Sequence, residues 1–165
     1  MFLDKHTFST VIKSTPLVSI DLVVFNTNGQ ALLGQRLNRP AKGFWFVPGG
    51  RILKDESLAQ AFKRLTIDEL GTEFAIEQAI LQGPYDHFYN DNVFGEAFTT
   101  HYVAISFILK IEQTLESLPI NIQHNNYKWF DIEDLLNNEA VHKHTKQYFK
   151  SLSSSICNHK KTTQD

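Results

Sequence analysis

Residues 50–71 have the sequence GRILKDESLAQAFKRLTIDELG, and this stretch decides the fold. Asp55 carries a short acidic side chain of the kind that caps the first turn of a helix, and Gly71 is suited to end one. Between them, apolar residues recur at helical spacing, at Leu58, Ala61, Phe62 and Leu65. The sequence therefore predicts an amphipathic helix from Glu56 to Leu70 with its apolar face in the core.

Charged residues near the end of this helix are candidates for a functional site. Glu69 lies on nearly the same side of the helix as Leu58 and Leu65. A carboxylate aligned with a core stripe is costly unless it is paired or binds a cation, so Glu69 is a candidate metal ligand, with a solvated charge at the helix end as the alternative. Arg64 and Asp68 are four residues apart and can pair across the side of the helix.

The length of the chain predicts one self-sufficient domain. At 165 residues, roughly 70% of the surface that the unfolded chain exposes can be buried on folding. We expect the domain to span residues 1–152, with residues 1–15 as an N-terminal arm and residues 153–165 as a polar tail. In the arm, Asp4 can cap a short helix that ends before Pro16. Its apolar face would hold Phe8, Val11 and Ile12.

Composition and charge argue against several classes of function. The formal net charge of −2 argues against a surface that binds nucleic acid, so any phosphate recognition must be local. Cys157 is the single cysteine, which rules out a disulfide within the chain. Asp4, Lys5 and His6 interrupt the apolar run that a signal peptide needs, and no stretch reaches membrane-spanning length. We therefore expect a cytoplasmic protein without a membrane partner.

The remaining pattern predicts strands before and after the central helix. Leu17–Phe25 is apolar and β-branched, and Asn28-Gly29 supplies a turn into a second strand, Ala31–Gln35. Pro48-Gly49-Gly50 predicts a tight turn that brings main-chain carbonyls close to a ligand. Further strands are expected at Phe44–Val47, Phe74–Gln82, Phe98–Ile111 and Tyr127–Phe130, a long loop at Gly83–Phe94, and terminal helices at Asp131–Leu136 and Glu139–Leu152. This order favours an α+β fold, an α/β/α sandwich built on a mixed sheet.

The central stretch resembles the signature of the Nudix hydrolases, G-x5-E-x7-R-E-U-x-E-E-x-G-U, where U is a bulky apolar residue. The residues in register are Gly50, Glu56, Arg64, Glu69 and Gly71. Asp68 stands in for one glutamate, Leu65 replaces another, and Thr72 occupies the final apolar position. The resemblance implies an α/β/α sandwich in which the glutamates hold Mg²⁺ or Mn²⁺ against a pyrophosphate. Leu65 removes one of those carboxylates, although a leucine at helical spacing is also an ordinary core residue.

Across nearly the whole chain, the sequence is similar to one branch of this family, the GDP-mannose mannosyl hydrolases. The segments that carry the similarity are STPLVS (14–19), NRPA (38–41), GFWFVPGGR (43–51), FKRLT (62–66), DHFY (86–89), FTTHYV (98–103) and QH (123–124). Leucine at the position of Leu65 belongs to the pattern of this branch. The resemblance implies hydrolysis of a GDP-hexose to GDP and free sugar, with water attacking the anomeric carbon and inverting its configuration.

The same resemblance implies roles for particular residues. It implies that one divalent ion binds per subunit, Mg²⁺ or alternatively Mn²⁺. The ligands would be the carbonyl of Gly49, Glu69 and the amide oxygen of Gln123. The resemblance makes His124 the general base, and it assigns Asp21 and His87 to the sugar hydroxyls or to the developing positive charge and Tyr102 to the leaving phosphate. Residues expected to hold the phosphates are Arg36, Arg51 and Arg64, and those expected near the nucleotide are Phe2, Leu3 and Phe8. If the N-terminal arm is exchanged between subunits, the protein is a homodimer.

Alternative interpretations exist for these residues and for the function. His87 and His124 taken alone are more often loop histidines, and Phe2 and Phe8 are equally compatible with hydrophobic anchors. Arg36 and Arg51 fit surface charges, while His101, His142 and His144 are interpreted as structural or solvated. A conventional Nudix pyrophosphohydrolase would release GMP and a sugar 1-phosphate. A binding module would recognise the nucleotide sugar without cleaving it.

Overall fold

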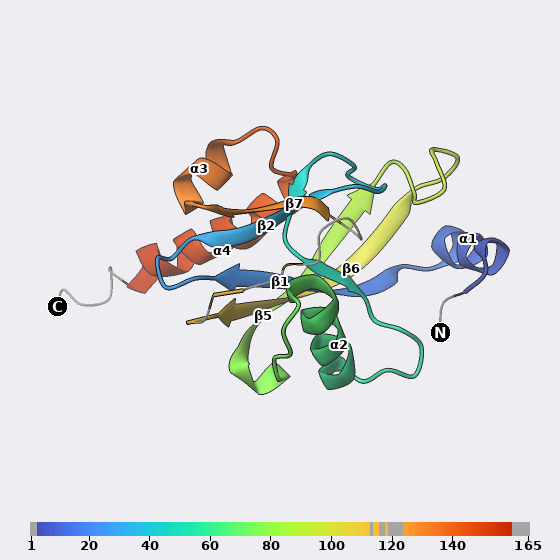
Figure 1. The fold of residues 1–165 in the computed structure, drawn as a ribbon. Coiled ribbons are helices and arrows are strands. Elements are labelled where there is room, and N and C mark those ends of the chain that lie inside the picture. Colours follow the sequence, from blue (N-terminus) through green and yellow to red (C-terminus); the bar gives the residue numbers. More distant parts are fainter. Residues whose placement is uncertain (1–2, 113, 116–117, 119–123, 160–165) are drawn as a thin grey trace.

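The computed structural model describes residues 3–112, 114–115, 118 and 124–159, without the side chains of residues 124–125 and 153–159 (Figure 1). The helices are α1 (Lys5–Ser14), α2 (Leu58–Leu70), α3 (Ile132–Asn137) and α4 (Lys143–His159), with a short 3₁₀ helix η1 (Ile76–Gln78). The strands are β1 (Leu17–Phe25), β2 (Ala31–Arg36), β3 (Trp45–Phe46), β4 (Gly49–Arg51), β5 (Ala79–Tyr89), β6 (Thr100–Lys110) and β7 (His124–Phe130). Asp4 caps α1 as predicted, because its Oδ1 accepts from the backbone N–H groups of His6 at 2.9 Å and Thr7 at 3.1 Å.

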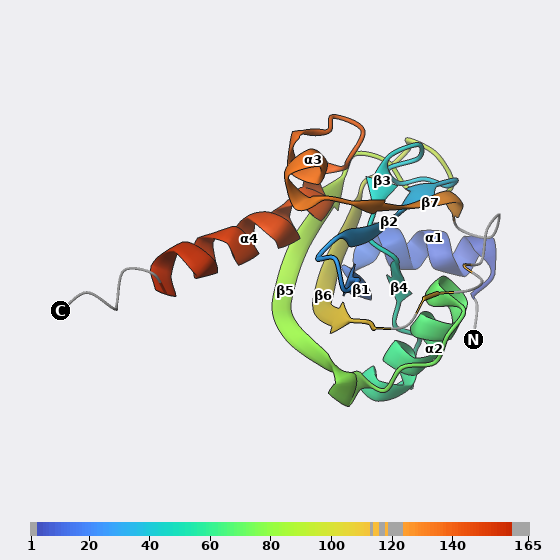
Figure 2. The same cartoon turned by 60° about the vertical axis from the view of Figure 1, so that its left-hand side comes forward.

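All strands form one mixed sheet. Its main order is β3-β2-β1-β6-β5, with β4 paired to β1 and β7 paired to β2. β1 and β6 are parallel, from the pair Leu17–Tyr102 to the pair Phe25–Lys110, and the other pairings are antiparallel. α2 covers one face of the sheet, and α3 and α4 cover the other (Figure 2). The predicted α+β class and mixed sheet are confirmed.

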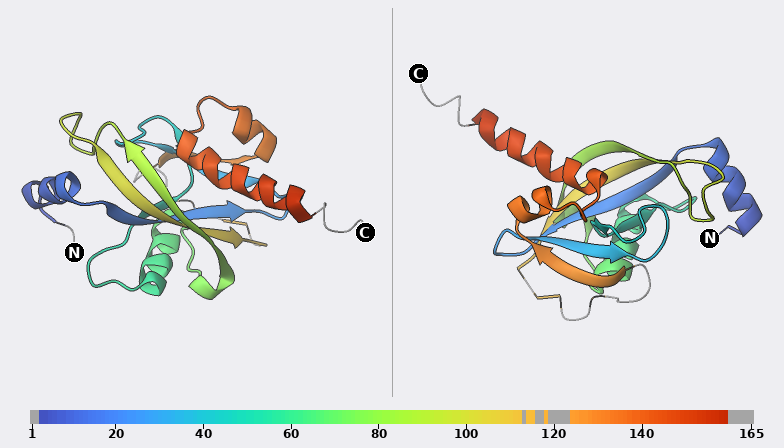
Figure 3. Two further views of the ribbon diagram at one scale, coloured as in Figure 1. Left: turned by 180° about the vertical axis from the view of Figure 1, so that it is seen from behind. Right: turned by 90° about the horizontal axis from the view of Figure 1, so that it is seen from above.

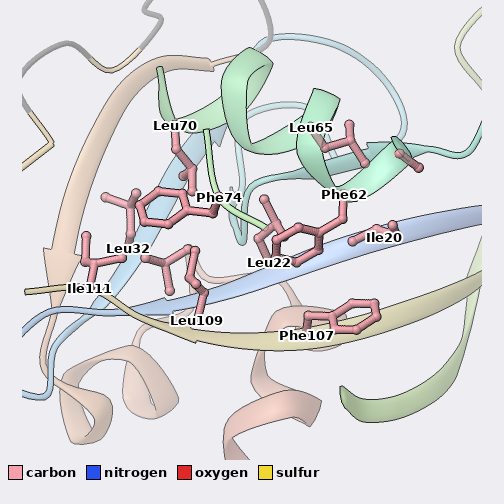
Figure 4. Packing of buried hydrophobic residues seen from close by; sticks show 12 residues of the cluster. Ile20, Leu22, Leu32, Phe62, Leu65, Leu70, Phe74, Phe107, Leu109 and Ile111 are labelled. Atoms are coloured by element: carbon pink, nitrogen blue, oxygen red, sulfur yellow. The ribbon is translucent and has the colours of Figure 1, made fainter. Parts of the chain in front are cut away.

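The face under α2 carries one hydrophobic core. Side chains alternate across a strand, so Ile20, Leu22 and Val24 of β1 point to this face. Phe62 and Leu65 of α2 pack against them (Figure 4). Further members of this cluster are Leu32, Ala61, Leu70, Phe74, Phe107, Leu109 and Ile111. The predicted apolar face of α2 is therefore buried, and Glu69 is buried with it at 1% exposure.

The opposite face, under α3 and α4, carries a second core. Val23 of β1 points to this side, where it packs with Tyr148 and Phe149 of α4. Other members are Ala31, Leu33, Phe46, Val47, Phe130, Leu135 and Val141. α4 runs across this face, and α1 lies at the far end of the molecule from the last turn of α4 (Figure 3). Asp21 alternates with Ile20 and Leu22, so its carboxylate is on the α4 side.

The predicted start of α2 is wrong. Ser57 is the N-cap, because its hydroxyl accepts from Gln60 N at 3.2 Å while Gln60 Oε1 accepts from Ser57 N at 2.9 Å. This reciprocal capping box satisfies two backbone donors, so it prevails over Asp55, which adopts a left-handed φ of 65° before the helix. Leu58, the first helical residue, is 45% exposed and does not belong to the apolar face. Gly71 ends the helix with φ 69°, as predicted.

The predicted loop at Gly83–Phe94 is also wrong over its first half. β5 continues to Tyr89 and stays paired with β6. Gly83, with φ 139°, lies at a register shift that absorbs the irregular backbone. Pro84 is tolerated because β5 is an edge strand, where a residue without an N–H need not cost a hydrogen bond to a neighbouring strand. The turn-forming residues Gly83 and Pro84 therefore mark a bulge, and the strand expected from Phe74 begins at Ala79.

Other boundaries also differ from the prediction, for example in β7, which begins at His124 and not at Tyr127. Gly49 and Gly50 lie in β4, paired with Asp21 and Ile20 of β1, instead of forming only a turn. The last helix starts at Lys143, not at Glu139, because an Asn138-centred turn precedes it, in which Asn138 Oδ1 accepts from Ala140 N at 2.9 Å. Across the described residues, every helix is too short or too polar to cross a membrane.

Candidate active site

A pocket of about 270 Å³ is lined by residues of β1, β2, β3, β4, β5, β6 and α2. The sequence-predicted residues that line it are Asp21, Arg36, Gly49, Arg51, Arg64, His87 and Tyr102. These residues come from six different elements, so the fold, and not proximity in sequence, brings them together. Leu65, Asp68 and Tyr89 complete much of the remaining wall.

Arg64 joins α2 to the segment before it. Its Nε and Nη2 donate to the two carboxylate oxygens of Glu56 at 2.7 and 2.8 Å, and Nη2 also donates to the carbonyl of Arg51 at 2.9 Å. The predicted pair with Asp68 is present but longer, at 3.4 Å. The hydrogen bonds from Arg64 lower the pKa of Glu56. Glu56 is therefore held by the guanidinium, and the role of Arg64 in phosphate binding stays a prediction.

Arg51 connects the N-terminal arm with the pocket. Its guanidinium carbon lies 4.0 Å from the ring centre of Phe8 on α1, a cation–π contact. Burial lowers the pKa of Arg51, although not enough to discharge a guanidinium at neutral pH. Phe8 thus reaches the site through Arg51, whereas Leu3 is 42% exposed. Phe2 lies outside the described residues.

Asp21 is buried in the floor of the pocket. The hydroxyl of Tyr148 donates to its Oδ2 at 2.6 Å, and Ser19 Oγ lies 3.5 Å from its Oδ1. Burial raises the pKa of Asp21 to about 6, against the opposing effect of the Tyr148 hydrogen bond and of the Arg36 charge. Asp21 is consequently a carboxylate above about pH 6, with its negative charge in a poorly solvated place.

His87, which lies beside Asp21, belongs to a cluster of three neighbouring histidines, two of which stack. The rings of His87 and His144 stack at 4.2 Å with an interplanar angle of 13°, and the ring of His142 lies 4.8 Å from that of His144. Burial, followed by the proximity of the other two imidazoles, lowers the pKa of His87 to about 3. His87 is therefore neutral at physiological pH, and its 4.0 Å separation from Asp21 is not an ion pair.

α4 and the residue before it contribute to this cluster, which the sequence did not predict. His142 and His144 were interpreted as structural or solvated, yet His144 is 4% exposed and stacks on a pocket residue. Tyr148 was not predicted at all, although it touches Asp21 and His87. His144 and Tyr148 are four residues apart, and this helical spacing was the available signal that they share a face.

Arg36 offers an unsatisfied donor in the pocket wall. Its Nε is buried, and no hydrogen-bond acceptor reaches it among the described residues. A buried donor of this kind is normally satisfied by a partner, so Arg36 is suited to bind an anionic ligand in the pocket. The backbone of His124 pairs with Arg36 across β2 and β7, which places His124 next to the pocket. The side chain of His124 and all of Gln123 lie outside the described residues.

Comparison with known proteins establishes the family. The NUDIX domain model matches residues 15–152. The chain belongs to the Nudix family. This Nudix protein is 34% identical over 145 residues to the low-salt glycan biosynthesis protein Agl8 of Haloferax volcanii, which covers 88% of this chain and 87% of that protein.

Solved structures show the same Nudix fold. A MutT protein from Methanosarcina mazei Go1 superposes with a TM-score of 0.68 at 20% identity, covering 87% of this chain and 97% of that one. The NUDIX domain of Shewanella oneidensis NrtR, solved with ADP ribose, superposes with a TM-score of 0.65 at 19% identity, covering 94% of this chain and 99% of that one. At these identities, the likeness concerns the fold.

Nudix hydrolases generally use divalent ions such as Mg²⁺ or Mn²⁺, and some donors for such an ion are present here. Glu69 is buried near Asp21, whose pKa its charge raises, and Gly49 lines the pocket. Carboxylate and carbonyl oxygens suit these hard cations. Within the described part of the chain, no three His, Cys, Asp or Glu side chains gather as a metal-binding group.

Leu65 occupies the position of a signature glutamate in this Nudix helix. It is 2% exposed and belongs to the core under α2. Its Cδ2 lies 2.7 Å from the point where a Cβ on Gly50 would be, so the helix packs directly on the glycine backbone. A larger residue at position 50 would require the Leu65 side chain to shift. An apolar contact thus takes the place of a carboxylate at this wall of the pocket.

Proposed function

We propose that the protein hydrolyses a GDP-hexose to GDP and the free sugar, with GDP-mannose and GDP-glucose as the expected substrates. Water attacks the anomeric carbon and inverts its configuration, and GDP leaves. The name of the Haloferax relative, a glycan biosynthesis protein, supports a substrate that contains a sugar. The conclusion depends mainly on how carboxylates are distributed around the pocket.

The α2 side of the pocket is poor in carboxylates that are available to metals. Glu56 is engaged by Arg64, Asp68 is paired with Arg64 and 53% exposed, and position 65 is a leucine. Cleavage at phosphorus in the Nudix family uses the glutamates of the signature to gather metal ions. Glu69 is a buried signature carboxylate near the end of this helix. We assign it to a single cation, because position 65 supplies no carboxylate for a cluster.

The opposite side of the pocket is suited to chemistry at carbon. Asp21 places a buried negative charge beside neutral His87. A carboxylate repels the phosphates of a nucleotide but stabilises the oxocarbenium-like charge that develops when a glycosidic bond breaks. Neutral His87 can hydrogen-bond a sugar hydroxyl. We therefore assign the sugar to the Asp21 side of the pocket.

The basic and phenolic groups are assigned to the diphosphate. Arg36 has a buried Nε without an acceptor among the described residues, and Arg51 lines the same pocket. Burial raises the pKa of Tyr102, so its hydroxyl keeps its proton and donates to a phosphate oxygen. Glu69, the Gly49 carbonyl and Gln123 would hold one divalent cation, which would supply further positive charge to the leaving GDP.

His124 is the proposed general base. Its backbone lies beside Arg36, and an imidazole titrates near neutral pH. A group in this role typically contributes about 10² to 10⁴-fold to the rate. In this assignment, His124 takes the proton from water at the anomeric carbon.

Product analysis tests the proposal. The protein is incubated with GDP-mannose and MgCl₂, and the products are separated without and with alkaline phosphatase. We expect GDP and free mannose before phosphatase is added. GMP with mannose 1-phosphate would establish the conventional Nudix reaction instead, and binding without products would establish a recognition module.

A homodimer stays part of the proposal. Phe8 contacts Arg51 of the same chain, so arm exchange is not needed for that contact. Light scattering of the purified protein measures the oligomeric state directly.

A further inference from the structure

Tyr148 of α4 lies between two residues assigned to the sugar. It is fully buried, its hydroxyl donates to Asp21 Oδ2 at 2.6 Å, and the same hydroxyl oxygen lies 3.2 Å from His87 Nε2. We propose that Tyr148 is a positioning residue that bridges Asp21 and His87 and fixes both for attack at the anomeric carbon. The catalytic part of this inference rests on the proposed function, whereas the bridge itself does not.

The hydrogens available on Tyr148, Asp21 and His87 determine the direction of each hydrogen bond in the bridge. Burial keeps the pKa of Tyr148 well above its usual value, so the phenol has one hydrogen to donate. The carboxylate of Asp21 has no hydrogen, so the short bond uses the phenol hydrogen. The phenol oxygen must then accept from His87, which requires the hydrogen of the imidazole to be on Nε2.

This tautomer leaves His87 Nδ1 as an acceptor. Nδ1 is 4.0 Å from Asp21 Oδ2, beyond hydrogen-bonding distance. Because His87 lines the pocket, a sugar hydroxyl is the natural donor to this nitrogen. The two carboxylate oxygens of Asp21 likewise face different groups. Oδ2 is held by Tyr148, and Oδ1 lies on the side of Gly49, where a Cβ would come within 3.0 Å of it.

The rings around Tyr148 are held by packing that does not involve its hydroxyl. The ring of Tyr85 meets that of Tyr148 edge to face at 4.8 Å and 87°. His144 stacks on His87, and its Nε2 lies 3.1 Å from the carbonyl of Phe88, to which it donates. Removing only the Tyr148 hydroxyl therefore breaks the bridge and leaves the packing intact.

Tyr148→Phe tests the bridge kinetically. We expect kcat for GDP-mannose to fall about 10- to 100-fold, the loss expected when a charge-assisted hydrogen bond no longer orients a catalytic group. KM should change less than about threefold, because the phosphate contacts are untouched. Tyr85→Phe is the matched control, since it loses a phenol that contacts Ser151 Oγ at 3.0 Å on the same helix. It should keep kcat within about twofold.

A second readout needs no substrate. Long-range ¹H–¹⁵N NMR spectra are recorded well above pH 6, where Asp21 is ionised, with His87 assigned through His87→Gln. They should show a protonated Nε2 and a bare Nδ1 in the wild-type protein. Tyr148→Phe should shift His87 toward a mixture of tautomers, and Tyr85→Phe should not. An Nδ1-protonated His87 in the wild-type protein overturns the bridge, and this result holds even if Tyr148→Phe fails to fold.

The two readouts separate the two proposals. If the His87 spectrum is as expected but the wild-type protein releases no free sugar, the proposed function fails and the bridge stands. If sugar is released and Tyr148→Phe changes neither kcat nor the tautomer, the positioning role fails and the proposed function stands.

Discussion

The two sides of the pocket are built in different ways. On the α2 side, the residues of the Nudix signature lie within residues 50–71, and Arg64 contacts Glu56 at 2.7 Å. On the α4 side, Asp21 and Tyr148 are 127 residues apart in sequence and meet at 2.6 Å. A local signature therefore identifies the first side, and only the folded chain reveals the second. The α2 side has lost a carboxylate, and the α4 side holds one in a buried network.

The largest effect is expected from the α4 side. Asp21→Asn keeps the shape of the side chain and an acceptor for Tyr148 but removes the charge. We expect kcat for GDP-mannose to fall about 10² to 10³-fold, because charge stabilisation in a poorly solvated site is lost. Asp86→Asn makes the same chemical change in a side chain that is 68% exposed, and it should change kcat less than about twofold. Full activity of Asp21→Asn would remove the α4 side from the mechanism.

Leu65→Glu tests whether residue 65 is part of the hydrophobic core. The substitution removes a buried apolar side chain and buries a carboxylate against Gly50. We expect urea unfolding to show a loss of about 3 kcal/mol or more in the free energy of unfolding. Ile67→Glu, at a position 44% exposed on the same helix, should stay within about 0.5 kcal/mol. Unchanged stability of Leu65→Glu would show that position 65 accepts a carboxylate as other Nudix helices do.

The pH dependence of stability tests whether the Asp21 carboxylate on the α4 side is poorly solvated. Burial raises the pKa of Asp21 from 3.8 to about 6, so the folded state favours the protonated acid. Ionisation as the pH rises from about 4 to 7 should cost wild-type stability on the order of 2–3 kcal/mol relative to Asp21→Asn. Thermal unfolding of both proteins across this range measures the difference. A constant difference would mean that Asp21 is ionised throughout and better solvated than its burial indicates.

Ionisation of Asp21 should raise activity, although it lowers stability. The proposed reaction uses the Asp21 carboxylate, so kcat/KM should rise as the pH passes through about 6. The pH–rate profile of the wild-type protein checks this. Activity that declines through this window would contradict the assigned charge.

The smallest effect concerns the ion pair on the α2 side. Glu56→Gln breaks the two-pronged contact with Arg64 and should lower the free energy of unfolding by about 1–3 kcal/mol. Asp68→Asn removes the longer, more exposed partner and should cost less than about 0.5 kcal/mol. Chemical denaturation of both variants compares the two carboxylates. Equal effects would mean that Glu56 is not the main partner of Arg64.

Much of the architecture was predictable because its signals are local. The apolar run of β1 and the Asp4 cap of α1 were identified with their observed boundaries, since alternation and capping act within a few residues. The start of α2 was misplaced because two capping residues compete and only the Ser57–Gln60 pair is reciprocal. β5 was cut short because Gly83 and Pro84 signal a turn unless the strand lies at an edge. Edge position depends on the whole sheet.

The candidate site divides in the same way. Asp21, Arg36, Arg51 and His87 were predicted through the family resemblance, and the fold places them around one pocket. Tyr148 and His144 carried no such motif, and their contacts with Asp21 and His87 depend on where α4 crosses the sheet. Sequence spacing indicates that they share a helical face but not which face of the sheet they meet.

Hydrolysis in ¹⁸O-labelled water tests the central claim most directly. The protein is incubated with GDP-mannose and MgCl₂, and mass spectrometry locates the label in the products. Attack at the anomeric carbon places ¹⁸O in free mannose and leaves GDP unlabelled. Label in a phosphate group would show that the protein cleaves at phosphorus and would contradict the account.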